Sequence, residues 1–107
     1  MLMMFSSVET RLFTRLVREY LTDEDYSRLQ RQLIENPKAG AVIQGSGGVR
    51  KLRWSTKGRG KRGGCRIIYY VRQPKGIIWM LTIYPKSARD SIPAHLLRRI
   101  REELADE

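Results

Sequence analysis

The sequence has 107 residues, 41% of them hydrophobic, and a formal net charge of +10. This length suits a single domain over residues 1–107 with one core, which excludes a wholly disordered chain. The single cysteine, Cys65, excludes an internal disulfide and a cysteine-cluster metal site. Because the first residues lack signal-peptide features and no apolar run reaches the length of a membrane span, we expect a soluble, cytoplasmic protein with no membrane association.

The first third of the chain predicts a short strand followed by two helices. Residues 2–8 favour an edge strand, and residues 10–21 repeat apolar side chains at helical spacing. Thr22 is placed as an N-cap before three acidic residues that favour the start of a second helix, which Asn36 and Pro37 end. We expect the two helices to form a hairpin. The side chains expected to face the core are Leu12, Phe13, Leu16, Val17, Tyr20, Leu21, Tyr26, Leu29, Leu33 and Ile34.

The rest of the chain predicts three strands and a last helix. Residues 49–54, 65–72 and 77–84 favour strands, and a turn at residues 73–76 joins the last two as a hairpin. A helix is expected to begin near residues 91–93. The side chains that it is expected to bury are Leu96, Leu97, Ile100 and Leu104. The predicted fold class is α+β, with an N-terminal helix hairpin packed on a small antiparallel sheet of three to four strands and a short C-terminal helix.

The positive charge is concentrated in the middle of the chain. Residues 36–89 hold thirteen Lys or Arg and no Asp or Glu, whereas the remaining residues carry a net charge of −3. Folding does not require this bias, because like charges repel one another in a compact state. A polyanionic partner, such as a nucleic acid, explains the bias better.

The alternation of side chains along the predicted strands makes the prediction of a polyanionic partner more specific. In the first of the three strands, Lys51 and Arg53 point to one face of the sheet. Leu52 and Trp54 point to the other face, where we expect them to anchor the core. Arg66 joins the two cations if the neighbouring strands align suitably. A run of charge is often only a solvated surface, and for the loop between these strands that alternative stays open. The candidates for binding the backbone of RNA or DNA are Arg50, Lys57, Arg59, Lys61 and Arg62.

The residue types that usually cleave phosphate esters are absent near these cations. The single histidine, His95, is expected at the surface, no carboxylate lies in the basic region, and no phosphate-binding loop motif is present. We therefore predict no bound metal and no cofactor. RNA, however, carries its own nucleophile in the 2′-hydroxyl group. Lys, Arg and Tyr side chains can orient that group, neutralise charge on the phosphate and move protons.

The order of these elements and motifs resembles a known family. A helix hairpin followed by VRKLRW, GKRGGCRIIYY, MLTIYPK and a short C-terminal helix is similar to the RelE superfamily of toxins, and most of all to the HigB-type branch of type II toxin–antitoxin systems. The resemblance covers nearly the whole chain. It implies a RelE-like fold and a metal-independent mRNA interferase, an endoribonuclease that cuts mRNA in the ribosomal A site, inhibits translation and arrests growth. It also implies a tightly bound antitoxin, which we predict to be a helix-turn-helix protein of the HigA type.

The resemblance assigns catalytic roles to five positions of this sequence. Lys51 and Arg53 match a pair of basic strand residues that contact the scissile phosphate and assist proton transfer. Arg66 matches the arginine that stabilises the transition state, and Lys86 matches a basic position at the edge of the site. Tyr84 is placed to orient a base or the nucleophile, although a core or interface role stays open for it. The residues that match a basic loop expected to hold ribosomal or messenger RNA are Lys57, Lys61 and Arg62.

One segment departs from the family pattern. Some relatives carry a tyrosine in the C-terminal segment that acts as general base or stacks on the substrate. Residues 87–97 contain no tyrosine and place Ile92 near that position, so the general base stays open between a lysine and Tyr84. Two other functions also stay open. One is a basic module that binds RNA or DNA without cutting it, and the other is an inactive relative retained to bind an acidic protein.

Overall fold

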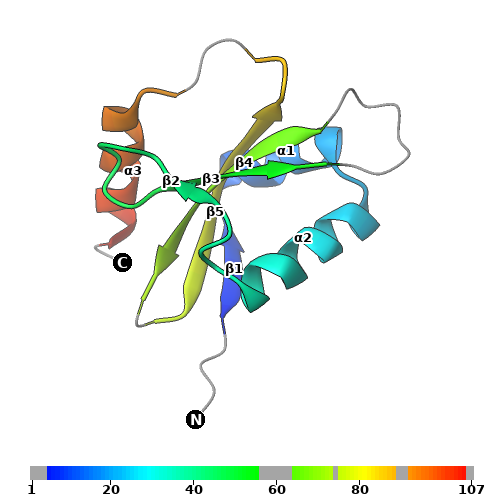
Figure 1. Cartoon of the computed structure of the whole chain (residues 1–107), viewed down its shortest axis with the longest axis horizontal. Coiled ribbons are helices and arrows are strands. Elements are labelled where there is room, and N and C mark those ends of the chain that lie inside the picture. Colours follow the sequence, from blue (N-terminus) through cyan, green and yellow to red (C-terminus); the bar gives the residue numbers. More distant parts are fainter. Residues whose placement is uncertain (1–4, 56–63, 74, 89–91, 106–107) are drawn as a thin grey trace.

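The order of elements matches much of the sequence-based prediction. A computed structural model of the chain describes residues 5–55, 64–73, 75–88 and 92–105. Figure 1 shows the strands and helices of these ranges. In chain order they are β1 (Ser6–Glu9), α1 (Arg11–Tyr20), α2 (Asp23–Glu35), β2 (Ala41–Val42), β3 (Arg50–Trp54), β4 (Cys65–Arg72), β5 (Ile77–Pro85) and α3 (Ala94–Ala105).

The strands form one mixed sheet in the order β1-β5-β4-β3-β2. Strand β1 is parallel to β5, whereas the other neighbours pair in antiparallel fashion. The prediction of three to four antiparallel strands was therefore wrong in strand number and in the direction of β1. The α+β class and the edge position of the first strand are confirmed. Strand β2 has only two residues, which is too short to leave an alternating pattern in the sequence.

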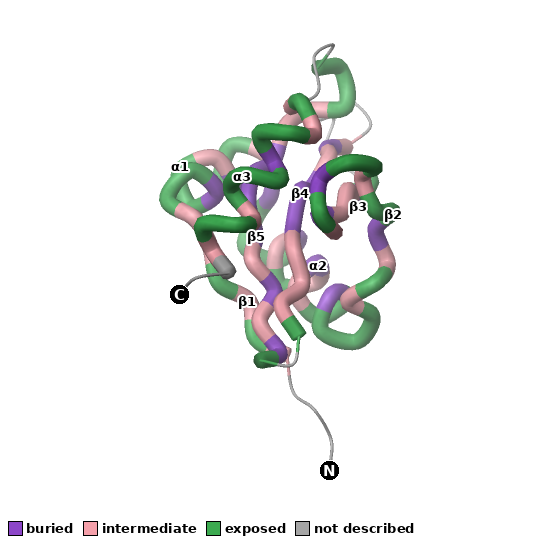
Figure 2. The backbone as a smooth tube through the Cα atoms, turned by 90° about the vertical axis from the view of Figure 1, so that its left-hand side faces the viewer, coloured by how far each residue is buried: buried purple, intermediate pink, exposed green. Residues whose placement is uncertain are grey.

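Helices cover both faces of the sheet. The first face packs against α1 and α2. The helices and the strands both contribute to the core cluster between them, which consists of Phe13, Val17, Leu21, Leu29, Leu33, Leu52, Trp54, Cys65, Ile67, Tyr69, Ile78, Met80 and Ile83. The second face packs against α3 through a smaller cluster of Val49, Ile68, Leu81 and Leu97. Figure 2 looks toward α3 and shows that most of this helix is exposed. The second face is therefore the less completely covered one.

A threonine caps the start of each of the first two helices. Thr10 caps α1 by accepting a hydrogen bond from the Phe13 backbone N–H at 3.1 Å. The Thr10 hydroxyl also donates to the Leu81 carbonyl at 2.8 Å, at a β-bulge of β5, and so ties α1 to the sheet. Thr22 caps α2 as predicted. The two helices meet through the rings of Phe13 and Tyr26, whose centroids lie 5.7 Å apart.

Four of the side chains predicted to face the core are exposed instead. They are Leu12, Ile34, Leu96 and Ile100, with exposed fractions of 37–43%. Each lies at the margin of its helix's apolar stripe, because the sheet contacts a narrower arc of each helix than the stripe spans. In the part of the chain that the structure describes, no helix is long and apolar enough to cross a membrane.

Candidate active site

Three predicted site residues form a row across the second face of the sheet. Arg53 of β3 pairs with Arg66 of β4, and Arg66 pairs in turn with Tyr84 of β5. Because paired residues point to the same face, the three side chains project side by side at one level of the sheet. The register that the sequence left undetermined therefore does bring Arg66 beside Arg53. The row lies where β3 ends and β4 begins.

A shallow pocket at this end of the sheet brings a further cation to the row. It is lined by Arg53, Trp54, Ser55, Arg66 and Lys86. Lys86 follows directly after β5, and its backbone N–H donates to the Gly64 carbonyl at 3.3 Å. This contact ties the segment after β5 to the residue that precedes β4. Three positive side chains from three different segments therefore converge on one pocket.

The remaining basic candidates lie at different distances from this pocket. Lys51 lies two residues before Arg53 on the same strand face and pairs with Ile68, one level further into the sheet. Arg50 points to the opposite face, where its guanidinium donates to the Gly40 carbonyl at 2.7 Å and to the Lys38 carbonyl at 3.4 Å. The structure thus does not bring Arg50 to the group. The loop candidates Lys57, Arg59, Lys61 and Arg62 lie outside the described residues.

The positive charge of this pocket has no acidic partner among the residues that the structure describes. Among the described residues, no carboxylate forms an ion pair with Arg53, Arg66 or Lys86. The Arg66 guanidinium donates to the carbonyl of Cys65 over a long distance of 3.4 Å. Like charges that face each other across neighbouring strands destabilise the sheet, so this arrangement opposes folding. An anion of phosphate size would relieve the repulsion by accepting hydrogen bonds from both guanidinium groups.

Tyr84 supplies a neutral donor beside these cations. Burial raises the pKa of its phenol above the usual value, although the charge of Arg66 lowers it in part. The phenol is therefore protonated at neutral pH and can donate a hydrogen bond to a phosphate or ribose oxygen. A protonated phenol does not accept a proton as a general base, so this geometry favours an orienting role for Tyr84.

The pocket contains two residues that the sequence analysis did not assign to it, Trp54 and Ser55. Trp54 was expected only as a core anchor, and Ser55 carried no signal because an isolated serine at a strand end has no distinguishing pattern. Ile92, which the sequence resemblance placed near the position of a C-terminal tyrosine in some relatives, packs against the apolar cluster under α3. Across the described ranges, no three His, Cys, Asp or Glu side chains come together as metal ligands.

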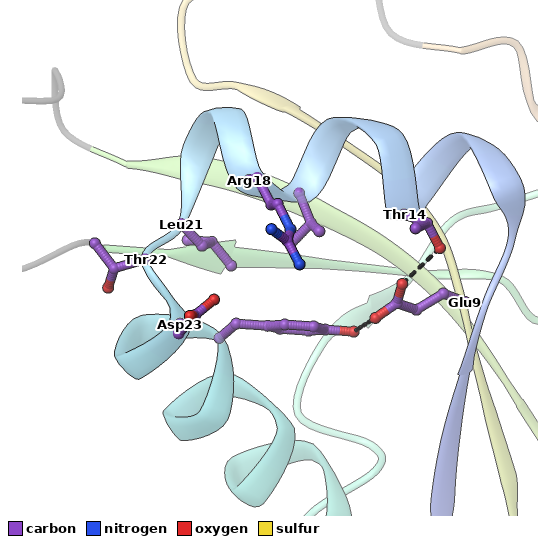
Figure 3. A pocket seen from close by; sticks show the side chains of 8 residues that line it. Glu9, Thr14, Arg18, Leu21, Thr22 and Asp23 are labelled. Atoms are coloured by element: carbon purple, nitrogen blue, oxygen red, sulfur yellow. Dashed lines mark hydrogen bonds between the residues drawn. The ribbon is translucent and has the colours of Figure 1, made fainter.

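A second pocket lies between α1 and α2 and holds a carboxylate. Figure 3 shows Glu9 at one end of it, with Arg18 extending over it from α1 and Asp23 at the start of α2. The Glu9 carboxylate accepts hydrogen bonds from the hydroxyl of Thr14 at 2.6 Å and from the phenol of Tyr26. These bonds tie β1 to both helices. Because the pocket opens beside the first face of the sheet and mixes both signs of charge, it does not extend the cation row.

The fold has the general arrangement of a small mixed sheet with two helices on one face and one on the other. No family model matches the chain. Among solved structures, the chain is similar to a mutant of the E. coli toxin RelE in the free state, with a TM-score of 0.62 and 15% sequence identity. The match covers 92% of this chain and 98% of that chain. The chain therefore has a RelE-like fold, as predicted, whereas the narrower placement in the HigB-type branch stays a prediction.

Proposed function

We propose that this chain is the toxin of a type II toxin–antitoxin system, a ribosome-dependent endoribonuclease that cuts mRNA in the ribosomal A site. The observation that carries the proposal is the row of Arg53, Arg66 and Tyr84, with Lys86 in the pocket beside it. Under this proposal, the row and Lys86 together supply two guanidinium groups, an ammonium group and a phenol to one phosphate. The RelE-like fold supports the same proposal, although a shared fold by itself does not establish an activity.

The proposed reaction uses the ribose 2′-hydroxyl as nucleophile and requires no metal. The 2′-oxygen attacks the adjacent phosphorus and forms a P–O2′ bond while the P–O5′ bond breaks. The upstream fragment then ends in a 2′,3′-cyclic phosphate, and the downstream fragment begins with a 5′-hydroxyl. One proton leaves the 2′-oxygen and one reaches the departing 5′-oxygen.

Each residue has a role that its position supports. Arg53 and Arg66 neutralise the charge that develops on the phosphate, which is the largest contribution that such a site makes. Lys86 at the pocket and Lys51 one level further in are the candidates for proton transfer. Tyr84 holds a substrate oxygen by donating a hydrogen bond, which fixes the geometry for in-line attack.

The proposed partners are the ribosome, mRNA and an antitoxin. These cations would bind RNA of many kinds in the cell, and an acidic partner would cover them and associate rapidly through electrostatic steering. We propose a helix-turn-helix antitoxin of the HigA type from the sequence resemblance alone. Binding of the antitoxin that does not weaken with added salt would contradict a mainly electrostatic interface.

The decisive experiment maps the ends of one mRNA after incubation with the purified protein, with and without translating ribosomes. We expect new 5′ ends in codon register only with ribosomes, and we expect those ends to carry a hydroxyl. Ends that carry a phosphate would contradict the 2′-hydroxyl mechanism. Intact mRNA in both samples, from folded protein that still binds RNA, would favour the non-catalytic basic binding module.

A further inference from the structure

Trp54 connects the candidate active site to the opposite face of the sheet. It is the last residue of β3, pairs with Cys65 at the start of β4, and lines the pocket together with Arg53 and Ser55. Because successive side chains of a strand point to opposite faces, the indole of Trp54 points away from the pocket. It lies in the core beneath α1 and α2, and only 6% of Trp54 is exposed. The packing of the indole therefore bears directly on the end of the strand that presents Arg53.

Two charged residues at the start of α2 hold this indole in place. The guanidinium carbon of Arg28 lies 4.8 Å from the centroid of a Trp54 ring, within the range of a cation–π contact. Arg28 is fixed in turn by Asp25, whose carboxylate accepts a hydrogen bond from Nη2 at 3.1 Å. Asp25 is buried, and its own backbone N–H donates to the capping hydroxyl of Thr22 at 3.0 Å. The first turn of α2 is thereby linked to the end of β3.

The position of Arg28 argues against direct contact with the substrate. Its charge is compensated by Asp25, and it lies on the first face of the sheet, whereas the cation row lies on the second face. A buried carboxylate beside a half-exposed arginine lowers the attraction of that arginine for a phosphate. A guanidinium held over an indole restricts, in contrast, the positions that the Trp54 side chain can take.

We propose that Arg28 and Asp25 are positioning residues for the candidate active site, which act by clamping Trp54 and so fix the end of β3 that presents Arg53. This inference rests on the proposed function for its effect on catalysis, but the clamp itself can be tested without any activity. The chain offers a matched control in Arg31, an exposed arginine one turn further along α2.

The first measurement follows the indole by fluorescence. In a Trp79→Phe background, Trp54 is the only tryptophan, and we expect Arg28→Ala to shift its emission to longer wavelength and to increase quenching by acrylamide. Arg28→Lys keeps the cation and should fall between Arg28→Ala and the parent. Arg31→Ala should match the parent. An indole signal unchanged by Arg28→Ala would overturn the clamp, whether or not the protein cuts RNA.

The second measurement separates positioning from substrate binding on translating ribosomes. We expect Arg28→Ala and Asp25→Asn to lower kcat by about 10- to 100-fold, because a displacement on the order of 1 Å has that effect. KM and the salt dependence of ribosome binding should stay unchanged. A fall in the salt slope by about 1 would identify Arg28 as a phosphate contact instead and overturn the proposal.

A third comparison distinguishes positioning from a general loss of stability. Urea unfolding gives the folded fraction of each variant, and rates are compared per folded molecule. Full activity per folded Arg28→Ala molecule would show that the contact only stabilises the fold, which would overturn the proposal. If the parent protein does not cut mRNA at all, the proposed function fails, while the fluorescence result still decides whether the clamp exists.

Discussion

Arg66 and Tyr84 face each other across β4 and β5, so a guanidinium group and a phenol project from one level of the sheet. Arg66 also faces Arg53 on its other side, which places two like charges opposite each other. The sheet thus holds the central arginine between a cation and a neutral donor. This placement suits the binding of a phosphate and gives no stability to the free protein.

Replacing Arg66 should therefore separate activity from stability. We expect Arg66→Ala to reduce cleavage by about 10²- to 10³-fold, the usual cost of removing one donor that stabilises transition-state charge. The free energy of unfolding should stay the same or rise slightly, because a repulsion with Arg53 is removed. Single-turnover cleavage and urea unfolding measure the two quantities. Arg99→Ala on the exposed surface of α3 is the control, and a folded, fully active Arg66→Ala protein would refute the site assignment.

Tyr84→Phe tests whether the phenol orients the substrate or transfers a proton. Because burial raises the pKa of Tyr84, the group stays protonated at neutral pH, and its ionisation should not shape the rate profile there. We expect the variant to lower the cleavage rate by about 3- to 10-fold, the size of one neutral hydrogen bond, and to keep the shape of the pH profile. The control is Tyr70→Phe, because Tyr70 lies in β4 on the same face of the sheet as Tyr84. A loss beyond about 100-fold with a shifted profile would instead indicate proton transfer.

Gly64 and Gly48 form a matched pair for testing the closure of the site. Both have positive φ, +99° and +105°, so alanine is strained at either position, by about 1–2 kcal/mol. At Gly64 an added Cβ would also lie 2.2 Å from the Trp54 carbonyl oxygen, whereas at Gly48 the nearest atom is 3.7 Å away. We expect Gly64→Ala to separate the ends of β3 and β4 and to reduce cleavage far more than Gly48→Ala. Equal loss of stability and activity in the two variants would contradict this.

Cys65 should behave as an inert thiol. It is 1% exposed, and burial raises its pKa from the ordinary value of 9.0 to about 11. At pH 8 its thiolate fraction is about 100-fold smaller than that of a free thiol, so alkylation by iodoacetamide should be slower by at least that factor. Protein unfolded in urea is the control.

The same shift gives Cys65 a pH-dependent effect on stability. The folded state binds the thiol proton more tightly than the unfolded state does, so this contribution is complete below about pH 9 and is lost as the pH rises through about 11. Unfolding by urea across this range measures it, and Cys65→Ala should remove part of the alkaline loss. Rapid alkylation of the native protein would show that the thiol is more accessible than its burial indicates.

The sequence predicted the local structure well, and it also predicted which face of the sheet carries the candidate site residues. Strand alternation correctly separated Lys51 and Arg53 from the core residues Leu52 and Trp54, because a half-buried strand has a strict period of two. It could not reveal that Arg50 donates to the carbonyls of Lys38 and Gly40, since those contacts depend on where the segment after α2 lies.

Contacts between remote segments were the main source of error. Strand β1 pairs with β5, and no local sequence pattern indicates a parallel partner so far along the chain. The exposed positions Leu12 and Ile100 fit the helical period but lie beyond the arc that the sheet reaches. The clamp of Arg28 on Trp54 joins two elements whose angle only the folded structure defines.

Because β1 pairs with β5, the sheet cannot be completed until late in the synthesis of the chain. The hydrogen bond from Thr10 to Leu81 spans 71 positions of sequence, so the first strand and helix emerge long before the strand that completes them. Tyr84 lies near the far end of that late strand, and Lys86 follows directly after it. Under the proposed function, the growing chain is harmless to the ribosome that makes it until its last strand joins the sheet.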